Sequence, residues 1–253
     1  MFSQISRYVL CALIGILIGI AIGVYLGRNV GNFGRRTEPI VSNISTNPIE
    51  QKLETPNTNE NRPLSAEEVA QRAKTLYEEG TTSSKAGKYA ESVELYKQAI
   101  DLKPDYAQAH HELGYASYRL RKYKESVESS EAAIKLRPEP STYSNLGLAM
   151  SALKRWDEAA KAFQKVIDAK PTNAHAYYGL GVAYKNLENN KSAIDALKEA
   201  VRLKPDYAAA HYELGLAFLR AEDQISAMHE YVILGQLNEQ LAAKLYTKMP
   251  EAP

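Results

Sequence analysis

The chain has 253 residues, of which 45% are hydrophobic and 24% are charged, the proportions of an ordinary globular protein. Its 31 basic and 30 acidic residues nearly cancel, so the chain lacks the positive field that would hold a nucleic acid. Cys11 is the single cysteine, which excludes an intrachain disulfide framework and thiolate metal sites. The length is enough for one substantial domain with appended segments.

An uncharged apolar run, YVLCALIGILIGIAIGVYLG, covers residues 8–27 after a short N-terminal tail of residues 1–7. Twenty helical residues reach about 30 Å, the thickness of a bilayer core. The sequence therefore predicts a single transmembrane helix over residues 8–27. One arginine precedes this run and three follow it closely, so the positive-inside rule favours a cytoplasmic location for the rest of the chain, with the periplasmic side as the alternative.

Glycines recur every fourth residue within this run, at Gly15, Gly19, Gly23 and Gly27. On a helix this spacing forms one smooth stripe that lets a second helix approach closely in lipid. We expect self-association of the protein through this glycine row. The alternative is a cleaved secretory signal, because Arg7 precedes the apolar run and Ala21 and Gly23 supply a small-residue cleavage site. Cleavage would leave an exported periplasmic module.

The next segment, residues 28–63, is rich in Asn, Thr, Pro and Glu and has no sustained apolar period. Such a composition cannot bury enough surface to offset its chain entropy. We expect a flexible linker between the transmembrane helix and the rest of the chain.

The remainder of the chain repeats itself with a period of 34 residues. LKPDYAQAHHELGYA begins at Leu102, and LKPDYAAAHYELGLA begins at Leu203, three periods less one residue later. A repeat domain is therefore predicted over residues 64–239. Its units cover residues 73–106, 107–139, 140–173, 174–207 and 208–239.

Each unit has the pattern of two amphipathic helices. In the first helix, a Leu-Gly pair such as Leu113-Gly114 follows an aromatic residue or histidine, and the glycine lets the two helices of a hairpin touch. In all but the last unit a proline ends the second helix, because proline cannot continue one. Residues 240–253 are predicted to form a capping helix and tail, with Asn238 as its N-cap.

These motifs resemble the tetratricopeptide repeat family, whose pattern is an aromatic residue, Leu-Gly, an aromatic residue, Ala, Phe and a closing Pro. The resemblance covers about two thirds of the chain. It implies an all-α, right-handed solenoid of about five helical hairpins plus a C-terminal capping helix. The first unit departs from the pattern, with Leu76 and Glu79-Gly80 at the positions of the aromatic residue and Leu-Gly.

In this family the first helices of successive hairpins line a concave groove, and the resemblance implies which residues face it. Tyrosine and arginine often dominate binding energy at interfaces, although we expect roughly half of these tyrosines to pack between hairpins. The groove is therefore expected to bind a protein partner through an extended or helical peptide segment with apolar anchors and some acidic character. The expected groove residues are Lys74, Tyr77, Lys85, His111, Tyr115, Tyr118, Arg119, Tyr178, Lys185, Tyr212 and Arg220.

Two binding modes known in the family are not expected in this chain. The carboxylate clamp needs Lys and Asn at positions that Tyr77 and Thr81 occupy here. The asparagine ladder of the sugar-transferase members is reduced to Asn145.

No catalytic, cofactor or metal site is expected. The five histidines do not form an HExxH motif, and His110 and His211 occupy the packing position of the repeat. We therefore expect a membrane-anchored scaffold for protein–protein interaction rather than an enzyme. Two alternatives remain, an exported periplasmic module and the substrate-recruiting arm of an enzyme complex.

Overall fold

The computed structural model describes residues 63–249, and all regular structure in this range is helical. The predicted transmembrane segment, its glycine row and the greater part of the linker lie outside the described residues. Among the described helices, none is both long and apolar enough to cross a bilayer. The helices are α2 (Ala66–Lys85), α3 (Tyr89–Leu102), α4 (Ala107–Arg119), α5 (Tyr123–Leu136), α6 (Pro140–Ala152), α7 (Trp156–Ala169), α8 (Ala174–Asn186), α9 (Asn190–Leu203), α10 (Ala208–Arg220), α11 (Gln224–Leu237) and α12 (Glu239–Tyr246).

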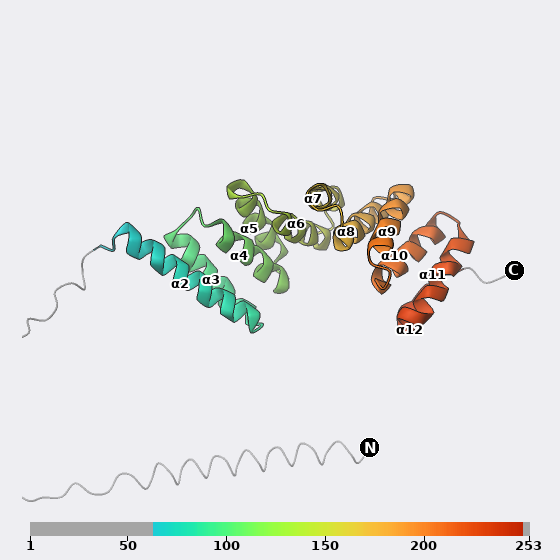
Figure 1. The fold of residues 1–253 in the computed structure, drawn as a ribbon, viewed down its shortest axis with the longest axis horizontal. Coiled ribbons are helices and arrows are strands. Elements are labelled where there is room, and N and C mark those ends of the chain that lie inside the picture. Colours follow the sequence, from blue (N-terminus) through green and yellow to red (C-terminus); the bar gives the residue numbers. More distant parts are fainter. Residues whose placement is uncertain (1–62, 250–253) are drawn as a thin grey trace, which may run out of the picture. The chain divides into compact units, whose positions relative to one another are not determined.

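Consecutive helices pair into five hairpins, from α2 with α3 to α10 with α11, and α12 follows the last hairpin. The hairpins succeed one another in chain order from α2 at one end to α12 at the other (Figure 1). The first helices of neighbouring hairpins also contact each other, α2 with α4, α4 with α6, α6 with α8 and α8 with α10. Together they form one continuous surface, which we call the first-helix face.

The first hairpin begins before residue 73, where the 34-residue period places it, because α2 starts at Ala66. A capping box fixes this start. The Ser65 side chain accepts a hydrogen bond from the Glu68 amide, and the Glu68 carboxylate accepts one from the Ser65 amide.

A residue in the left-handed backbone conformation joins the two helices of each hairpin. Its φ angle is 77° at Gly87 and between 59° and 61° at the other four positions. The amide that follows it closes a six-residue hydrogen-bonded turn, as from Lys88 to the Ser83 carbonyl. Only the first hairpin uses glycine, the residue that adopts this conformation without strain. The other four hairpins use Arg121, Lys154, Glu188 and Glu222.

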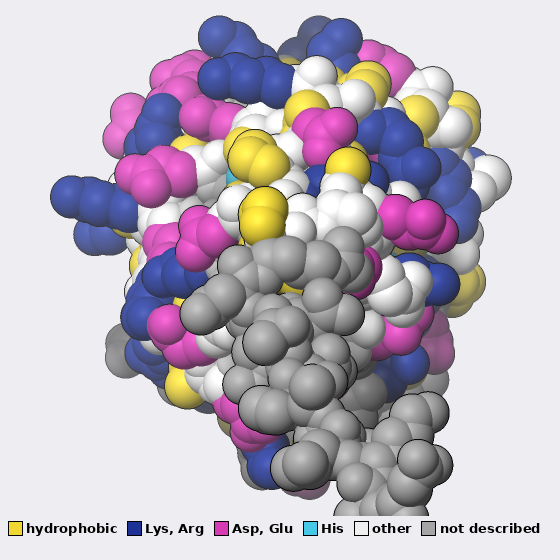
Figure 2. Space-filling model, turned by 90° about the vertical axis from the view of Figure 1, so that its left-hand side faces the viewer, with side chains coloured by type: hydrophobic (Ala, Val, Ile, Leu, Met, Phe, Trp, Pro, Cys, Tyr) yellow, Lys and Arg dark blue, Asp and Glu magenta, His cyan; other side chains and the backbone are white. Residues whose placement is uncertain are grey.

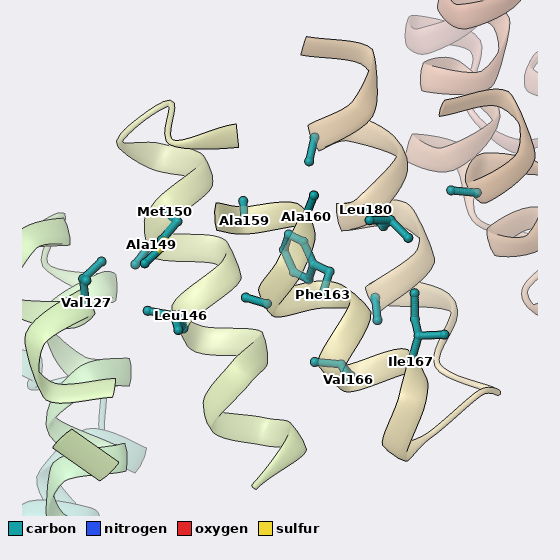
Figure 3. Packing of buried hydrophobic residues seen from close by; sticks show 14 residues of the cluster. Val127, Leu146, Ala149, Met150, Ala159, Ala160, Phe163, Val166, Ile167 and Leu180 are labelled. Carbon is teal, nitrogen blue, oxygen red and sulfur yellow. The ribbon is translucent and has the colours of Figure 1, made fainter. Parts of the chain in front are cut away.

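Close helix contact within a hairpin depends on one repeated glycine of the first helix. A Cβ on this glycine would lie 2.8 Å from Tyr96 at Gly80, 2.9 Å from Phe163 at Gly147 and 2.5 Å from Leu197 at Gly181. Real Cβ atoms do not approach that closely, so only glycine fits. The largest core cluster surrounds Phe163, and Figure 3 shows its ring among the labelled side chains of α6, α7 and α8.

The last hairpin completes its core with α12. Asn238 caps this helix, because its side chain accepts a hydrogen bond from the Leu241 amide at 3.0 Å. Leu245 is fully buried, and its side chain lies 2.5 Å from the Cβ position of Gly215. A leucine of α12 thus takes the place that the partner helix fills in other hairpins, as a capping element should.

Candidate functional site

The eleven residues expected in the groove all belong to first helices, namely α2, α4, α8 and α10. Helix α6, in the middle of the first-helix face, contributes none of them and presents Leu148, whose side chain is 41% exposed. Four are exposed, namely Lys74, Lys85, Arg119 and Arg220. Seven are half-buried, namely Tyr77, His111, Tyr115, Tyr118, Tyr178, Lys185 and Tyr212.

Much of the ring surface of the half-buried tyrosines is used in packing. The Tyr77 ring centroid lies 5.1 Å from that of Tyr106, and Tyr118 packs against the core cluster around Phe163. Tyr212 packs against the cluster of Leu234, Ala242 and Leu245 beneath α12. These tyrosines therefore hold hairpins together, and only part of each ring remains for a partner.

Tyr178 has the most strongly shifted pKa among the tyrosines of the described residues. Its ring centroid lies 5.0 Å from that of Tyr207. Burial raises the pKa of Tyr178 to about 12, with smaller contributions from the Glu213 carboxylate and Tyr207. The phenol is therefore protonated at physiological pH and acts as a neutral packing group.

Most of the expected groove cations already have partners within the chain. The Arg119 guanidinium lies 4.4 Å from the Tyr89 ring centroid and donates a 2.6 Å hydrogen bond to the Tyr115 hydroxyl. Lys185 forms a part-buried ion pair with Glu213. Arg220 donates a 2.7 Å hydrogen bond to the Lys185 carbonyl oxygen. These contacts bridge α8 to α10 and the first hairpin to the second, so they also have a structural role.

Lys74 and Lys85 are held less firmly. The Lys74 ammonium lies 3.8 Å from the Glu78 carboxylate, and both side chains are 60% exposed. Such surface pairs contribute little to stability and open readily. Lys85, at the C-terminal end of α2, has no hydrogen-bond or ion-pair partner among residues 63–249.

A hollow of about 210 Å³ opens on the first-helix face between α2, α4 and the start of α6. On one side, His111 Nδ1 lies 2.9 Å from the Thr142 hydroxyl, a contact that joins α4 to α6. The wall consists of Tyr77, Ala107, Gln108, His111, Glu112, Arg137, Glu139 and Thr142.

Sequence reasoning missed the charged groups of this hollow. Glu112 directly precedes the Leu-Gly pair, and Glu78 and Glu213 occupy the same position in other repeats. This recurrence is the signal that could have placed carboxylates on the first-helix face. Arg137 and Glu139 lie in the loop before α6, where the repeat pattern specifies no side chain.

The hollow is small, and no cluster of metal-ligating side chains among the described residues lines it. In residues 63–249, no three His, Cys, Asp or Glu side chains converge as metal ligands. Its volume is below the 300–1,000 Å³ of typical small-molecule sites.

A second surface, on α11, also exposes apolar side chains. Ile225 is 86% exposed and Val232 is 56% exposed. The equivalent positions of α9 carry Lys191 and Lys198. The solvent-facing side of α11 is therefore more apolar than that of α9. By contrast, Figure 2 shows basic and acidic side chains interspersed over the uncovered part of the surface at the α2 end.

Comparison with known proteins agrees with this architecture. A TPR repeat model matches residues 85–121, 151–188 and 186–221, and a tetratricopeptide repeat model matches residues 107–140. The hairpins are thus tetratricopeptide repeats, and the chain is a tetratricopeptide repeat protein. The expected family is confirmed, as is an all-helical solenoid over the described residues.

Several solved structures share this fold. MamA from Desulfovibrio magneticus RS-1, residue 41 to the end, is 25% identical with a TM-score of 0.64, over 67% of this chain and 96% of that one. MamA of MSR-1 is 26% identical with a TM-score of 0.60, over 67% and 98%. YrrB, described as a TPR protein with an unusual peptide-binding site, has a TM-score of 0.62 over 72% and 100%, and its 17% identity establishes the fold alone. No curated protein matches the sequence.

Proposed function

We propose that this protein is a membrane-anchored scaffold that binds a segment of a partner protein along its first-helix face. The observation that carries this proposal is the continuity of the face, because each first helix contacts the next from α2 to α10. A partner segment laid across it would meet exposed polar and apolar side chains from every hairpin. The described residues contain no cluster of metal-ligating side chains that would favour a catalytic role.

The partner segment would contact the outer edges of the tyrosines rather than deep aromatic pockets, since most of these rings pack between hairpins. Exposed Leu148 offers an apolar contact on α6, at the middle of the face. Replacing the tyrosines by alanine would be a poor test, because loss of packing would destabilise the hairpins.

Leu148→Glu tests the proposal without disturbing the core. The full-length chain in detergent captures proteins from an extract of its source cells, and mass spectrometry quantifies them. We expect L148E to lose its specific partner, because a charge placed on the contact surface must be desolvated on binding. Ile225→Glu on α11 is the matched control and should retain the partner. Loss with I225E and retention with L148E would instead identify α11 as the contact surface.

The membrane anchor rests on the apolar run of residues 8–27 and has its own test. The full-length chain should stay in the membrane pellet after alkaline extraction, whereas a chain starting at residue 64 should be released. Replacing Gly15, Gly19, Gly23 and Gly27 by leucine should abolish cross-linking between copies if the glycine row pairs the helices. A shorter mature N-terminus, starting within the apolar run, would show a cleaved signal instead.

A further inference from the structure

The hollow on the first-helix face contains a carboxylate that lacks an internal counter-ion. Glu112 is half-buried and has neither a hydrogen bond nor an ion pair with another described residue. Among the other charges of the wall, Arg137 and Glu139 lie 2.5 Å apart and neutralise each other. The wall therefore carries one uncompensated negative charge.

The surroundings of Glu112 favour a cation with an apolar stem. Tyr77, on α2, also lines the hollow, and the part of its ring that is not packed offers apolar surface to such a stem. Ala107 and Gln108 add neutral surface on α4. A long basic side chain combines an apolar stem with a charged tip and matches both features.

The size of the hollow matches a single side chain. At about 30 Å³ for each water molecule in the liquid, 210 Å³ holds roughly seven waters. This volume accommodates the end of one side chain, whereas a nucleotide or other cofactor needs a larger site.

We propose that the hollow binds one lysine or arginine side chain of the partner segment, with Glu112 as its counter-ion. This inference rests on the proposed function, because it assigns the chemistry of one position of the bound segment. It also divides the first-helix face by charge. The hollow accepts a basic residue, whereas the expected groove cations lie near the C-terminal ends of α2, α4, α8 and α10, apart from Lys74. A partner with acidic residues alone would leave Glu112 unpaired.

The test begins with random peptides displayed on phage and selected on the full-length chain in detergent. We expect the selected peptides to share a lysine or arginine. A synthetic copy of the tightest peptide is then compared with one that carries citrulline, the uncharged isostere of arginine, at the shared position. Fluorescence anisotropy measures both affinities. If the shared residue is lysine, arginine replaces it first.

A double-mutant cycle then links the peptide cation to Glu112. Glu112→Gln keeps the shape of the side chain and should weaken the arginine peptide about tenfold, the usual effect of losing a charge-assisted hydrogen bond. The citrulline peptide should bind both proteins equally, because its charge is already absent. Glu128→Gln, an exposed carboxylate on α5, is the control and should change neither affinity.

A variant that should increase the affinity for the arginine peptide distinguishes a charge effect from a loss of structure. Arg137→Gln frees Glu139 and adds a second uncompensated carboxylate, so the arginine peptide should bind a few times more tightly. Circular dichroism verifies that each variant folds. Selected peptides that lack a basic residue, lose affinity for L148E and bind E112Q as tightly as wild type would overturn this inference. They would leave the proposed function standing. Peptides whose affinity is unchanged by L148E and by E112Q would overturn both this inference and the proposed function.

Discussion

Phe163 has a glycine on each side, and its ring packs closely against both. Its ring lies 2.9 Å from the Cβ position of Gly147 in α6 and 2.5 Å from that of Gly179 in α8. The ring therefore joins two hairpins as well as the two helices of its own hairpin. Any side chain at either glycine would force the ring to move.

Gly179→Ala should therefore lower the free energy of unfolding by about 1–3 kcal/mol, the usual cost of an overpacked core. Urea denaturation followed by circular dichroism measures the change. Gly235→Ala is the matched control, because no atom lies within 4 Å of its Cβ position. It should stabilise α11 by about 0.5–1 kcal/mol through helix propensity. Phe163→Leu should reduce the cost of Gly179→Ala, and equal costs in both backgrounds would contradict the account.

His211 is a buried histidine with a hydrogen-bond partner at each ring nitrogen. Its Nε2–H donates to the Pro205 carbonyl oxygen at 2.9 Å, and its Nδ1–H donates to the Glu230 carboxylate at 2.6 Å. When Glu230 is a carboxylate, both partners accept and each needs a proton on the facing nitrogen, which defines an imidazolium. Burial by itself lowers the pKa of His211, but the hydrogen bonds and the charge of Glu230 raise it overall.

A raised pKa makes this contribution to stability depend on pH. The stabilisation is fully present below the ordinary pKa of 6.5 and is lost as pH rises through the higher value of the folded protein. Urea denaturation at a series of pH values should show stability falling across this window. His211→Gln should remove that fall. A wild-type stability that rises through the same window would contradict a charged His211.

At the scale of elements, four of the five hairpin turns carry avoidable backbone strain. Glu188 has a φ angle of 61°, a conformation that costs a non-glycine residue about 1–2 kcal/mol. Glu188→Gly removes this cost but adds about 0.4–1 kcal/mol of chain entropy to the unfolded state. A net gain of roughly 0.5–1 kcal/mol is expected in thermal or urea unfolding. Gly87→Ala should instead lower the free energy of unfolding, because φ is 77° at this position. The space around it is open, so the added methyl group causes backbone strain and no clash.

The capping helix α12 should control the stability of the last hairpin alone. Leu245→Ala removes a fully buried side chain from the cluster of Leu234 and Ala242, so a local loss of about 2–5 kcal/mol is expected. In a solenoid each hairpin contacts only its neighbours, so amide exchange should accelerate in α10, α11 and α12 first. Exposed Lys244→Ala should leave the exchange rates unchanged. Uniform acceleration from α2 onward would contradict this view.

At the scale of the whole molecule, the 34-residue period predicts the fold over the described residues. The spacing of the Leu-Gly pairs and closing prolines is set by the way the helices pack. These residues therefore predict the helices, the ends of the second helices and the contacts within each hairpin. Hydrogen bonds and ion pairs between side chains were less predictable. Sequence position placed Lys185 and Arg220 on the first-helix face, but their contacts with Glu213 and the Lys185 carbonyl depend on neighbouring hairpins. The recurrent glutamate before the Leu-Gly pair could have indicated Glu112, but the sequence does not show that this carboxylate lacks a counter-ion.

Site-specific photo-cross-linking tests the proposed binding of a partner by the first-helix face most directly. A photoreactive amino acid is placed at exposed positions of first helices and, as controls, at exposed positions of second helices in the full-length chain. The first set is Gln108, Ser141 and His175, and the second is Glu131, Lys165 and Lys198. After irradiation in the source cells, one partner protein should be cross-linked to the first set of positions and to none of the second set. Equal joining from both sets, or joining from the second set alone, would contradict it.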